Sequence, residues 1–209
     1  MSDGVTHGDP TAERDDVTMS EDITHESIRC PQCYTTFTDR MEACPQCGFS
    51  LATLDTQMPP PPLQAGPVND WADVLTAEDA QRLLQKCQAI HQAAQAELSV
   101  VTVETTIPLK PAEYVFWLAN HWDIGGSENR GLLILLALHE RRIESEVGYG
   151  LEPLLSDTES ELIIQEHVVP YLYAGQYAEG LYQAVNALGQ ALIVKHKVAT
   201  RKRWRDRFV

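Results

Sequence analysis

Four of the five cysteines stand in two closely spaced pairs near the N-terminus. Each pair has the form CPQC; the first begins at Cys30 and the second at Cys44, with ten residues between them. Two thiolates three positions apart can bind one ion from a single tight turn, and zinc takes four such soft ligands in a tetrahedron. A closed site of this kind folds its segment and does not catalyse. The spacing therefore predicts a structural Zn2+ ion held by Cys30, Cys33, Cys44 and Cys47.

Other chemistry for these cysteines is less consistent with the pattern. Free or disulfide-bonded thiols are the first alternative, but CxxC pairs in a reducing compartment favour metal. A redox role requires a strand-to-helix junction, which neither pair has. The first pair is followed by Tyr34 where the second is followed by Gly48, a small departure from the ideal turn. The remaining cysteine, Cys87, lies on the apolar stripe of a predicted helix and is interpreted as a core residue.

Residues 28–50 resemble the short zinc ribbons found at the start of many bacterial proteins. Such ribbons bind partners and sometimes nucleic acid. Here only Arg29 and Arg40 supply positive charge nearby, and residues 1–29 hold eight acids against two bases. Phosphate binding needs a basic surface, so a protein partner is favoured over nucleic acid.

Composition divides the rest of the chain. The formal net charge is −14, and residues 1–27 are rich in Asp, Glu, Ser and Thr, which predicts an acidic disordered N-terminus. Residues 51–67 contain four consecutive prolines from Pro59 and are interpreted as an extended, semi-stiff linker. There is no apolar run of about 18 residues and no signal peptide. We therefore expect a cytoplasmic protein.

Residues 68–194 show the periodicities of an α/β domain. The run Leu132–Leu138 is apolar at every position, as in a strand covered on both faces. Residues Arg142–Val147 alternate, as in an edge or half-exposed strand, and should form a hairpin with the preceding strand. The predicted elements are a helix from Thr76, a strand at Leu98–Val103, a helix at Ala112–His121, the two strands just named, a helix from Thr158 to about Tyr171 and a helix from Tyr177 to at least Val194.

A succession of short segments carries a resemblance to a known family. They are NDWADVLT from Asn69, WDIG from Trp122, NRGLLIL from Asn129, VGYGLE from Val147, LSD from Leu155, then Pro170, GQY from Gly175 and GL from Gly180. This ordered set resembles the TPM domain, over residues 68–194. The resemblance implies a three-layer α/β/α fold around a small mixed sheet.

The same resemblance implies several functions for the domain. Members have been linked to acid phosphatase activity, to binding of calcium or other divalent cations, and to repair or assembly of membrane complexes. Many bacterial members are exported and membrane-anchored. This chain departs from them by its zinc ribbon and by the expected lack of a signal peptide and a spanning helix.

Candidate oxygen ligands follow from the resemblance. The family's acidic positions match Asp70 and Asp157, and Glu128 and Asn129 lie on the loop that enters the central strand. Carboxylate and amide oxygens suit Ca2+ or Mg2+. Helix capping is the alternative for both aspartates. Arg130, Arg141 and Arg142 could contact phosphate, although Arg130 stands where relatives place a small polar residue, and no known nucleophile motif is present.

The C-terminal residues 195–209 are basic, with seven bases and one acid. They are predicted to extend the last helix, with Trp204 and Phe208 on one face. Three interpretations stay open: a solvated helix end, docking on an anionic membrane surface or an acidic partner, and nucleic-acid binding.

Two functions follow. The first is a non-enzymatic adaptor, or an assembly or quality-control factor, in which the ribbon binds a protein partner and the domain binds another protein or a divalent cation. The second is a metal-dependent phosphatase that acts on phosphate monoesters. Catalysis requires an open coordination position and cations that face the phosphate, whereas an adaptor requires neither. The sequence favours the adaptor.

Overall fold

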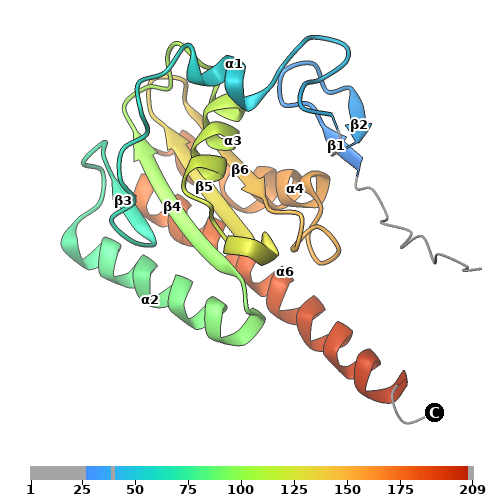
Figure 1. The fold of residues 1–209 in the computed structure, drawn as a ribbon. Helices are drawn as coiled ribbons and strands as arrows, with labels where there is room; N and C mark the ends of the chain where they lie inside the picture. Colours follow the sequence, from blue (N-terminus) through green and yellow to red (C-terminus); the bar gives the residue numbers. More distant parts are fainter. Residues whose placement is uncertain (1–26, 39–40, 207–209) are drawn as a thin grey trace, which may run out of the picture.

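The structure is a computed structural model and describes residues 27–38 and 41–206. The segment predicted to be disordered, residues 1–27, lies outside the described residues except for Ser27. The elements are β1 (Ser27–Arg29), β2 (Thr36–Thr38), α1 (Leu51–Asp55), β3 (Val68–Asp70), α2 (Ala77–Ala94), β4 (Glu97–Val103), α3 (Pro111–His121), the 3-10 turn η1 (Gly126–Glu128), β5 (Gly131–Ala137), β6 (Arg142–Val147), α4 (Asp157–His167), α5 (Val169–Tyr173) and α6 (Tyr177–Asp206) (Figure 1).

A four-stranded mixed sheet forms the centre of the molecule. Its strand order is β3-β4-β5-β6, with the first three strands parallel and β6 antiparallel to β5. All seven residues of β5 are buried, as expected for a strand covered on both faces. The hairpin and the edge position of residues 142–147 are therefore confirmed.

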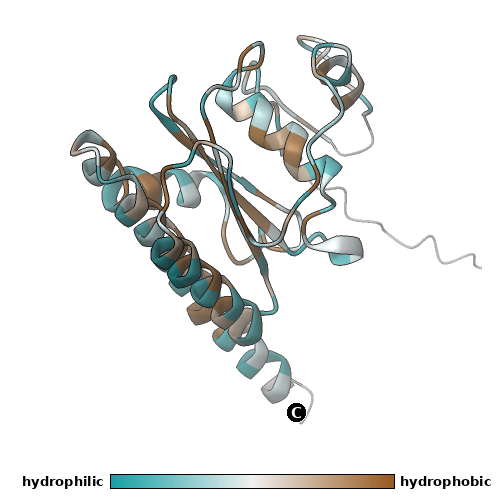
Figure 2. Cartoon of the chain, turned by 90° about the vertical axis from the view of Figure 1, so that its left-hand side faces the viewer, coloured by the Kyte–Doolittle hydropathy of each residue, from teal (hydrophilic) through white to brown (hydrophobic). Residues whose placement is uncertain are grey.

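Helices cover the two faces of the sheet. Helices α2 and α6 lie side by side on one face, and α3 lies on the other (Figures 1 and 2). Alternate residues of β5 pack into the two hydrophobic layers on either side of the sheet. Ile134 packs toward α2 and α6, and Leu133 packs toward α3. This is the three-layer α/β/α arrangement that the resemblance to the TPM domain implies.

Three features were not predicted. Strand β3 has only three residues, and the side chain of Asn69 fixes its approach by accepting from Ala65 N and donating to Gly66 O, both at 2.8 Å. The helix expected to reach Tyr171 ends at His167, because Pro170 has no N–H to donate to the helix; Pro170 lies instead in the first turn of the separate helix α5.

The third difference concerns the linker. Residues 51–55 form α1, and the prolines that follow lie against the domain. The Nε1–H of Trp122 donates to Pro62 O at 2.8 Å, and Gln64 donates to Ser99 Oγ at 2.9 Å. The C-terminal part of this segment is therefore held against the domain.

Helix α6 continues through the basic residues as far as Asp206 and projects beyond the domain (Figure 1). Among the described residues, no helix has both the length and the apolar character needed to cross a membrane.

A glycine at the start of β5 generates a stability prediction. A Cβ on Gly131 would lie 2.2 Å from the backbone oxygen of Ile124, which cannot move without disturbing the loop before β5. We expect Gly131→Ala to lower the free energy of unfolding by at least about 2 kcal/mol in urea titrations. In the control Gly180→Ala, the Cβ would meet no backbone atom; its nearest neighbours are Leu172 Cδ2 at 3.0 Å, the end of a flexible side chain, and Tyr171 Cβ at 3.4 Å. The control should stay within about 1 kcal/mol of the parent, and equal losses in the two variants would contradict this account.

Candidate functional site

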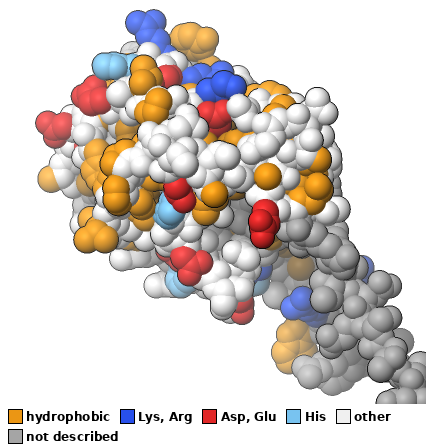
Figure 3. Space-filling model, turned by 45° about the horizontal axis from the view of Figure 1, so that its top comes forward, with side chains coloured by type: hydrophobic (Ala, Val, Ile, Leu, Met, Phe, Trp, Pro, Cys, Tyr) orange, Lys and Arg blue, Asp and Glu red, His pale blue; other side chains and the backbone are white. Residues whose placement is uncertain are grey.

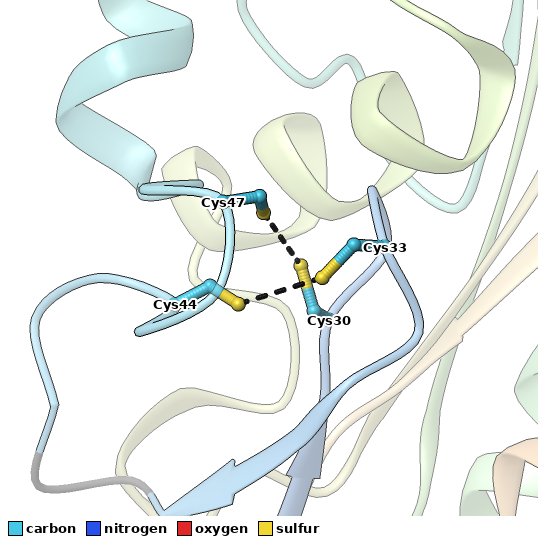
Figure 4. Close-up of side chains that lie close together, drawn as sticks. All are labelled: Cys30, Cys33, Cys44 and Cys47. Carbon is cyan, nitrogen blue, oxygen red and sulfur yellow. Dashed lines mark hydrogen bonds between the residues drawn. The ribbon is translucent and has the colours of Figure 1, made fainter.

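The four cysteines predicted to bind zinc come together in the structure (Figure 4). Their sulfur atoms all lie within 4.8 Å of one another. Cys30 Sγ is 3.6 Å from Cys47 Sγ, and Cys33 Sγ is 3.6 Å from Cys44 Sγ. Four sulfurs placed about 2.3 Å from a tetrahedral zinc ion are separated by about 3.8 Å. The spacing fits a four-thiolate metal site, and these residues would hold the ion.

The two CPQC turns have the same backbone geometry. In the first, Tyr34 N donates to Cys30 O at 2.9 Å, and in the second, Gly48 N donates to Cys44 O at 2.8 Å. Tyr34 has φ 62° and Gly48 has φ 74°. Tyr34 therefore adopts the left-handed conformation that glycine supplies without strain. The Arg29 guanidinium lies 5.0 Å from the centre of the Tyr34 ring, a contact that holds the tyrosine in place.

The thiols have unequal affinities for protons. Hydrogen bonds from Thr35 lower the pKa of Cys33 to about 6, whereas burial raises the pKa of Cys47 to about 12. Thiolates this close to one another repel, so the cluster is stable in its fully ionised form only around a cation. A bound zinc ion would supply that charge.

The cysteine module shares a hydrophobic core with α3. Cys30, Cys44, Phe49 and Leu54 are buried in one cluster with the residues of α3 and of the adjoining sheet face. The rings of Phe49 and Phe116 are 5.2 Å apart. Burying a side chain such as Leu54 stabilises this contact by roughly 1.5–3 kcal/mol. The module therefore packs against the domain through a shared hydrophobic core.

Hydrogen bonds also hold the cysteine module against α3. The carboxylate of Asp55, at the end of α1, accepts from Trp117 Nε1 at 2.9 Å and lies 2.7 Å from His121 Nε2. These two bonds lower the pKa of Asp55. Trp117 is almost fully buried, with 1% of its surface exposed, so Asp55 supplies the acceptor that its indole N–H needs.

Asp70, a predicted oxygen ligand, fastens a turn. Its carboxylate accepts from Val74 N at 3.2 Å, from Leu75 N at 2.8 Å and from the Thr102 hydroxyl. The N-cap of α2 is Thr76, so Asp70 does not cap that helix itself.

Asp70 and Asn129 lie toward opposite ends of the sheet. Asp70 pairs with Thr102, which pairs with Leu136 near the end of β5, whereas Asn129 precedes the first residue of β5. The five residue steps from Gly131 to Leu136 span about 16 Å along the strand. The structure therefore does not bring the four predicted oxygen ligands to one point.

Glu128 and Asn129 form the loop that enters β5. Asn129 O accepts from Gly150 N at 3.0 Å, and Asn129 lines a cavity of about 90 Å3 together with Glu146 and Tyr149. Within the described residues, the four cysteines form the only group of three or more His, Cys, Asp or Glu side chains close enough to share an ion. A single Ca2+ or Mg2+ site formed by all four of Asp70, Glu128, Asn129 and Asp157 does not fit this arrangement, and cation binding by part of the set stays a prediction.

Glu146 is an acid that the sequence analysis did not single out as a candidate site residue. Glu146 is half-buried on β6, and burial together with the charges of Asp157 and Glu152 raises its pKa to about 8. Asp157 is the first residue of α4, after the N-cap Ser156. Burial raises the pKa of Asp157, and Arg29 opposes that shift. Perturbed carboxylates that line a cleft mark a candidate functional site.

The three candidate phosphate contacts have different surroundings. The Arg130 guanidinium donates to the carbonyls of Ala94, Gln95 and Gly150 at 2.9–3.0 Å, so it ties the end of α2 to the turn after β6. Arg142 pairs with Glu144 at 2.9 Å. Arg141 is exposed in the β5–β6 turn.

Glu146 generates a pH prediction. Because its pKa rises from 4.5 to about 8 on folding, the folded state holds the proton over that interval and loses stability as the pH rises through it. We expect Glu146→Gln to exceed the parent in unfolding free energy by more than about 1 kcal/mol at pH 8 and to match it near pH 4.5. The control Glu144→Gln removes an acid on the same strand face that pairs with Arg142, and should show no gain at pH 8. A pH-independent difference for Glu146→Gln would contradict the prediction.

Comparison with known proteins places this geometry in a family. The family model of the TPM domain matches residues 68–191 of this chain. The solution structure of the N-terminal domain of a P. gingivalis protein (PgR37A) is similar, with 28% identity, a TM-score of 0.60 and coverage of 75% of this chain and 96% of that one.

Two further structures share the fold. The N-terminal domain of the cg2496 protein from Corynebacterium glutamicum has 14% identity, a TM-score of 0.51 and coverage of 63% of this chain and 82% of its own. The BA42 protein from the psychrophilic bacterium Bizionia argentinensis has 18% identity, a TM-score of 0.50 and coverage of 59% and 84%. No curated protein matches the chain. On the extent of the match over residues 68–191, the chain belongs to the TPM domain family.

Proposed function

We propose that this chain is a non-enzymatic adaptor whose zinc-bound ribbon and TPM domain act together as one binding unit. The observation that carries the proposal is the four-sulfur cluster, whose buried members Cys30 and Cys44 belong to the same hydrophobic core as α3. A metal at that point would fix the ribbon relative to the domain. A partner would then meet both modules at a constant geometry.

The surface between the modules supports this role. A cavity of about 150 Å3 is lined by ribbon residues from Arg29 to Tyr34 and by residues of α3, β6 and α4. In contrast, hydrophobic side chains on the face shown in Figure 3 are scattered among acidic and basic ones. Scattered apolar residues of this kind are normal on a protein surface and do not indicate docking. We therefore place partner binding at the junction of ribbon and domain.

A divalent cation is a second candidate ligand. The charges of Glu152 and Asp157 act on Glu146, and a Ca2+ or Mg2+ ion would relieve their mutual repulsion. A phosphatase would also need cations that face the phosphate. Arg130 and Arg142 are occupied by protein acceptors, which is why we favour an adaptor over a metal-dependent phosphatase.

The projecting part of α6 offers a further binding surface. Its described basic residues include the exposed Lys197, Arg201 and Lys202, and Trp204 is 68% exposed. Basic residues with an aromatic side chain suit an anionic membrane surface, which would place a cytoplasmic protein at the membrane periphery. Nucleic acid is a weaker candidate because residues 68–194 carry 18 acids against six bases.

Metal content tests the foundation of the proposal. We expect one zinc ion per chain by atomic absorption after gel filtration, and less than about one tenth of that in Cys44→Ser because three thiolates bind far more weakly. Cys87→Ala is the matched control, since Cys87 is buried in the opposite layer, and it should keep one ion. Equal zinc in Cys44→Ser and the parent would contradict the assignment.

Copurification and a phosphatase assay test the adaptor role. A partner that copurifies with the tagged parent and with Cys87→Ala should be lost from Cys44→Ser, because that variant loses the fixed ribbon.

The parent should not hydrolyse p-nitrophenyl phosphate with Ca2+ or Mg2+. Hydrolysis by the parent that Glu146→Gln abolishes would replace the adaptor with the phosphatase.

A further inference from the structure

Strand β6 forms one edge of the sheet, and the register shows which of its backbone groups face outward. Gly148 N donates to Gly131 O at 2.8 Å, and these two residues stand opposite each other in the β5–β6 register. Hydrogen-bonded and non-bonded pairs alternate along an antiparallel ladder. Glu146 and Glu144 therefore bond to β5, whereas the N–H and C=O groups of Ser145 and Ile143 point away from the sheet.

No described residue satisfies these outward groups. The hydrogen bonds of residues 27–38 and 41–206 include none to the backbone N–H or C=O of Ser145 or Ile143. The Ser145 hydroxyl pairs with Ser160 Oγ at 2.6 Å, but that contact leaves the backbone groups open. An edge with unpaired N–H and C=O groups is a template for one more strand.

The open edge lies in a groove. Residues Arg142–Glu146 line the cavity of about 150 Å3 between α3, α4 and the ribbon. Val115, Ile143 and Ile164 give it apolar walls, and Pro31 and Tyr34 of the ribbon close one side. A water molecule takes about 30 Å3 of liquid volume, so this cavity has room for a long side chain.

Charge selects the kind of side chain. Two carboxylates that line the groove carry negative charge near neutral pH without an ion-pair partner on β6 or α4, namely those of Asp157 and Glu161, whereas Glu146 holds a proton and Glu144 is neutralised by Arg142. Arg29 is the one ribbon cation among the lining residues. The groove is therefore electronegative, and a Lys or Arg side chain would complement it.

We propose that the edge of β6 binds an extended segment of a partner protein, which adds a fifth strand to the sheet and places a Lys or Arg side chain in the groove beside the ribbon. This mode takes affinity from backbone hydrogen bonds and specificity from side-chain pockets. The inference rests on the adaptor role proposed above and names the chemistry of its partner. The metal would contribute to binding by holding the ribbon in place as one wall of the groove.

Peptide selection on the zinc-loaded full chain provides the test. The probe is a display library of random heptapeptides, and the selected peptides are synthesised and titrated by fluorescence anisotropy. We expect Lys or Arg at one fixed position, with β-branched residues on either side. Selection of acidic peptides, or of no peptide, would overturn the proposal.

Ser145 supplies a matched pair of variants. Ser145→Pro removes the outward N–H, which the β5–β6 ladder does not use, and should weaken binding of the selected peptides at least about tenfold. Ser145→Ala loses the same contact to Ser160 but keeps the N–H, so its affinity should stay within about twofold of the parent. Equal affinity of Ser145→Pro and Ser145→Ala would overturn strand addition.

Amide hydrogen exchange gives the answer even if Ser145→Pro does not fold. In the parent, a bound peptide should slow exchange at the amides of Ser145 and Ile143, while Glu144 and Glu146 are protected beforehand by β5. Unchanged exchange at Ser145 would overturn the proposal. A copurified partner that is lost from Cys44→Ser but retained by Ser145→Pro would overturn the groove alone and leave the adaptor role standing.

Discussion

Helix α3 is buried over more than half of its circumference, and the arrangement of the N-terminal module follows from that. Its buried residues Glu113, Tyr114, Val115, Trp117 and Leu118 cover an arc of about 200° at 100° per residue. A surface helix needs an apolar stripe of only about 100°. The sheet covers one side of α3, so a second cover is required, and the ribbon with α1 provides it.

This two-sided burial accounts for the position of the metal cluster. A small ribbon cannot bury enough surface to fold by itself, so it depends on metal, on a neighbouring core, or on both. Here Phe49 and Leu54 reach the α3 core directly after the second CPQC turn, and Asp55 receives the indole N–H of Trp117. The metal site and the domain core are thus mechanically joined, which also sets the wall of the groove along β6.

The parts predictable from sequence are those fixed by short-range spacing. Thiol spacing, the uninterrupted apolar run of β5 and the alternation along β6 each reflect local geometry. The ordered set of segments that resembles the TPM domain then predicted the overall fold. The missed parts depend on distant partners. Arg130 donates hydrogen bonds to carbonyl groups at the end of α2 and after β6. Pro62 of the linker is held by Trp122, 60 residues further along the chain. Glu146 became a candidate because folding buries it in part and brings Asp157 and Glu152 next to it.

Hydrogen exchange of the full chain, with zinc bound and after chelation, tests most directly whether the ribbon is part of the TPM domain. If the shared core is as described, chelation should accelerate exchange both in residues 27–50 and along α3, with Trp117 and Leu118 among the most affected, while α2 and α6 keep their protection. The ribbon would then be a structural cover of α3. Faster exchange confined to residues 27–50, with α3 unchanged, would contradict the account and show the ribbon to be an independent module on a tether.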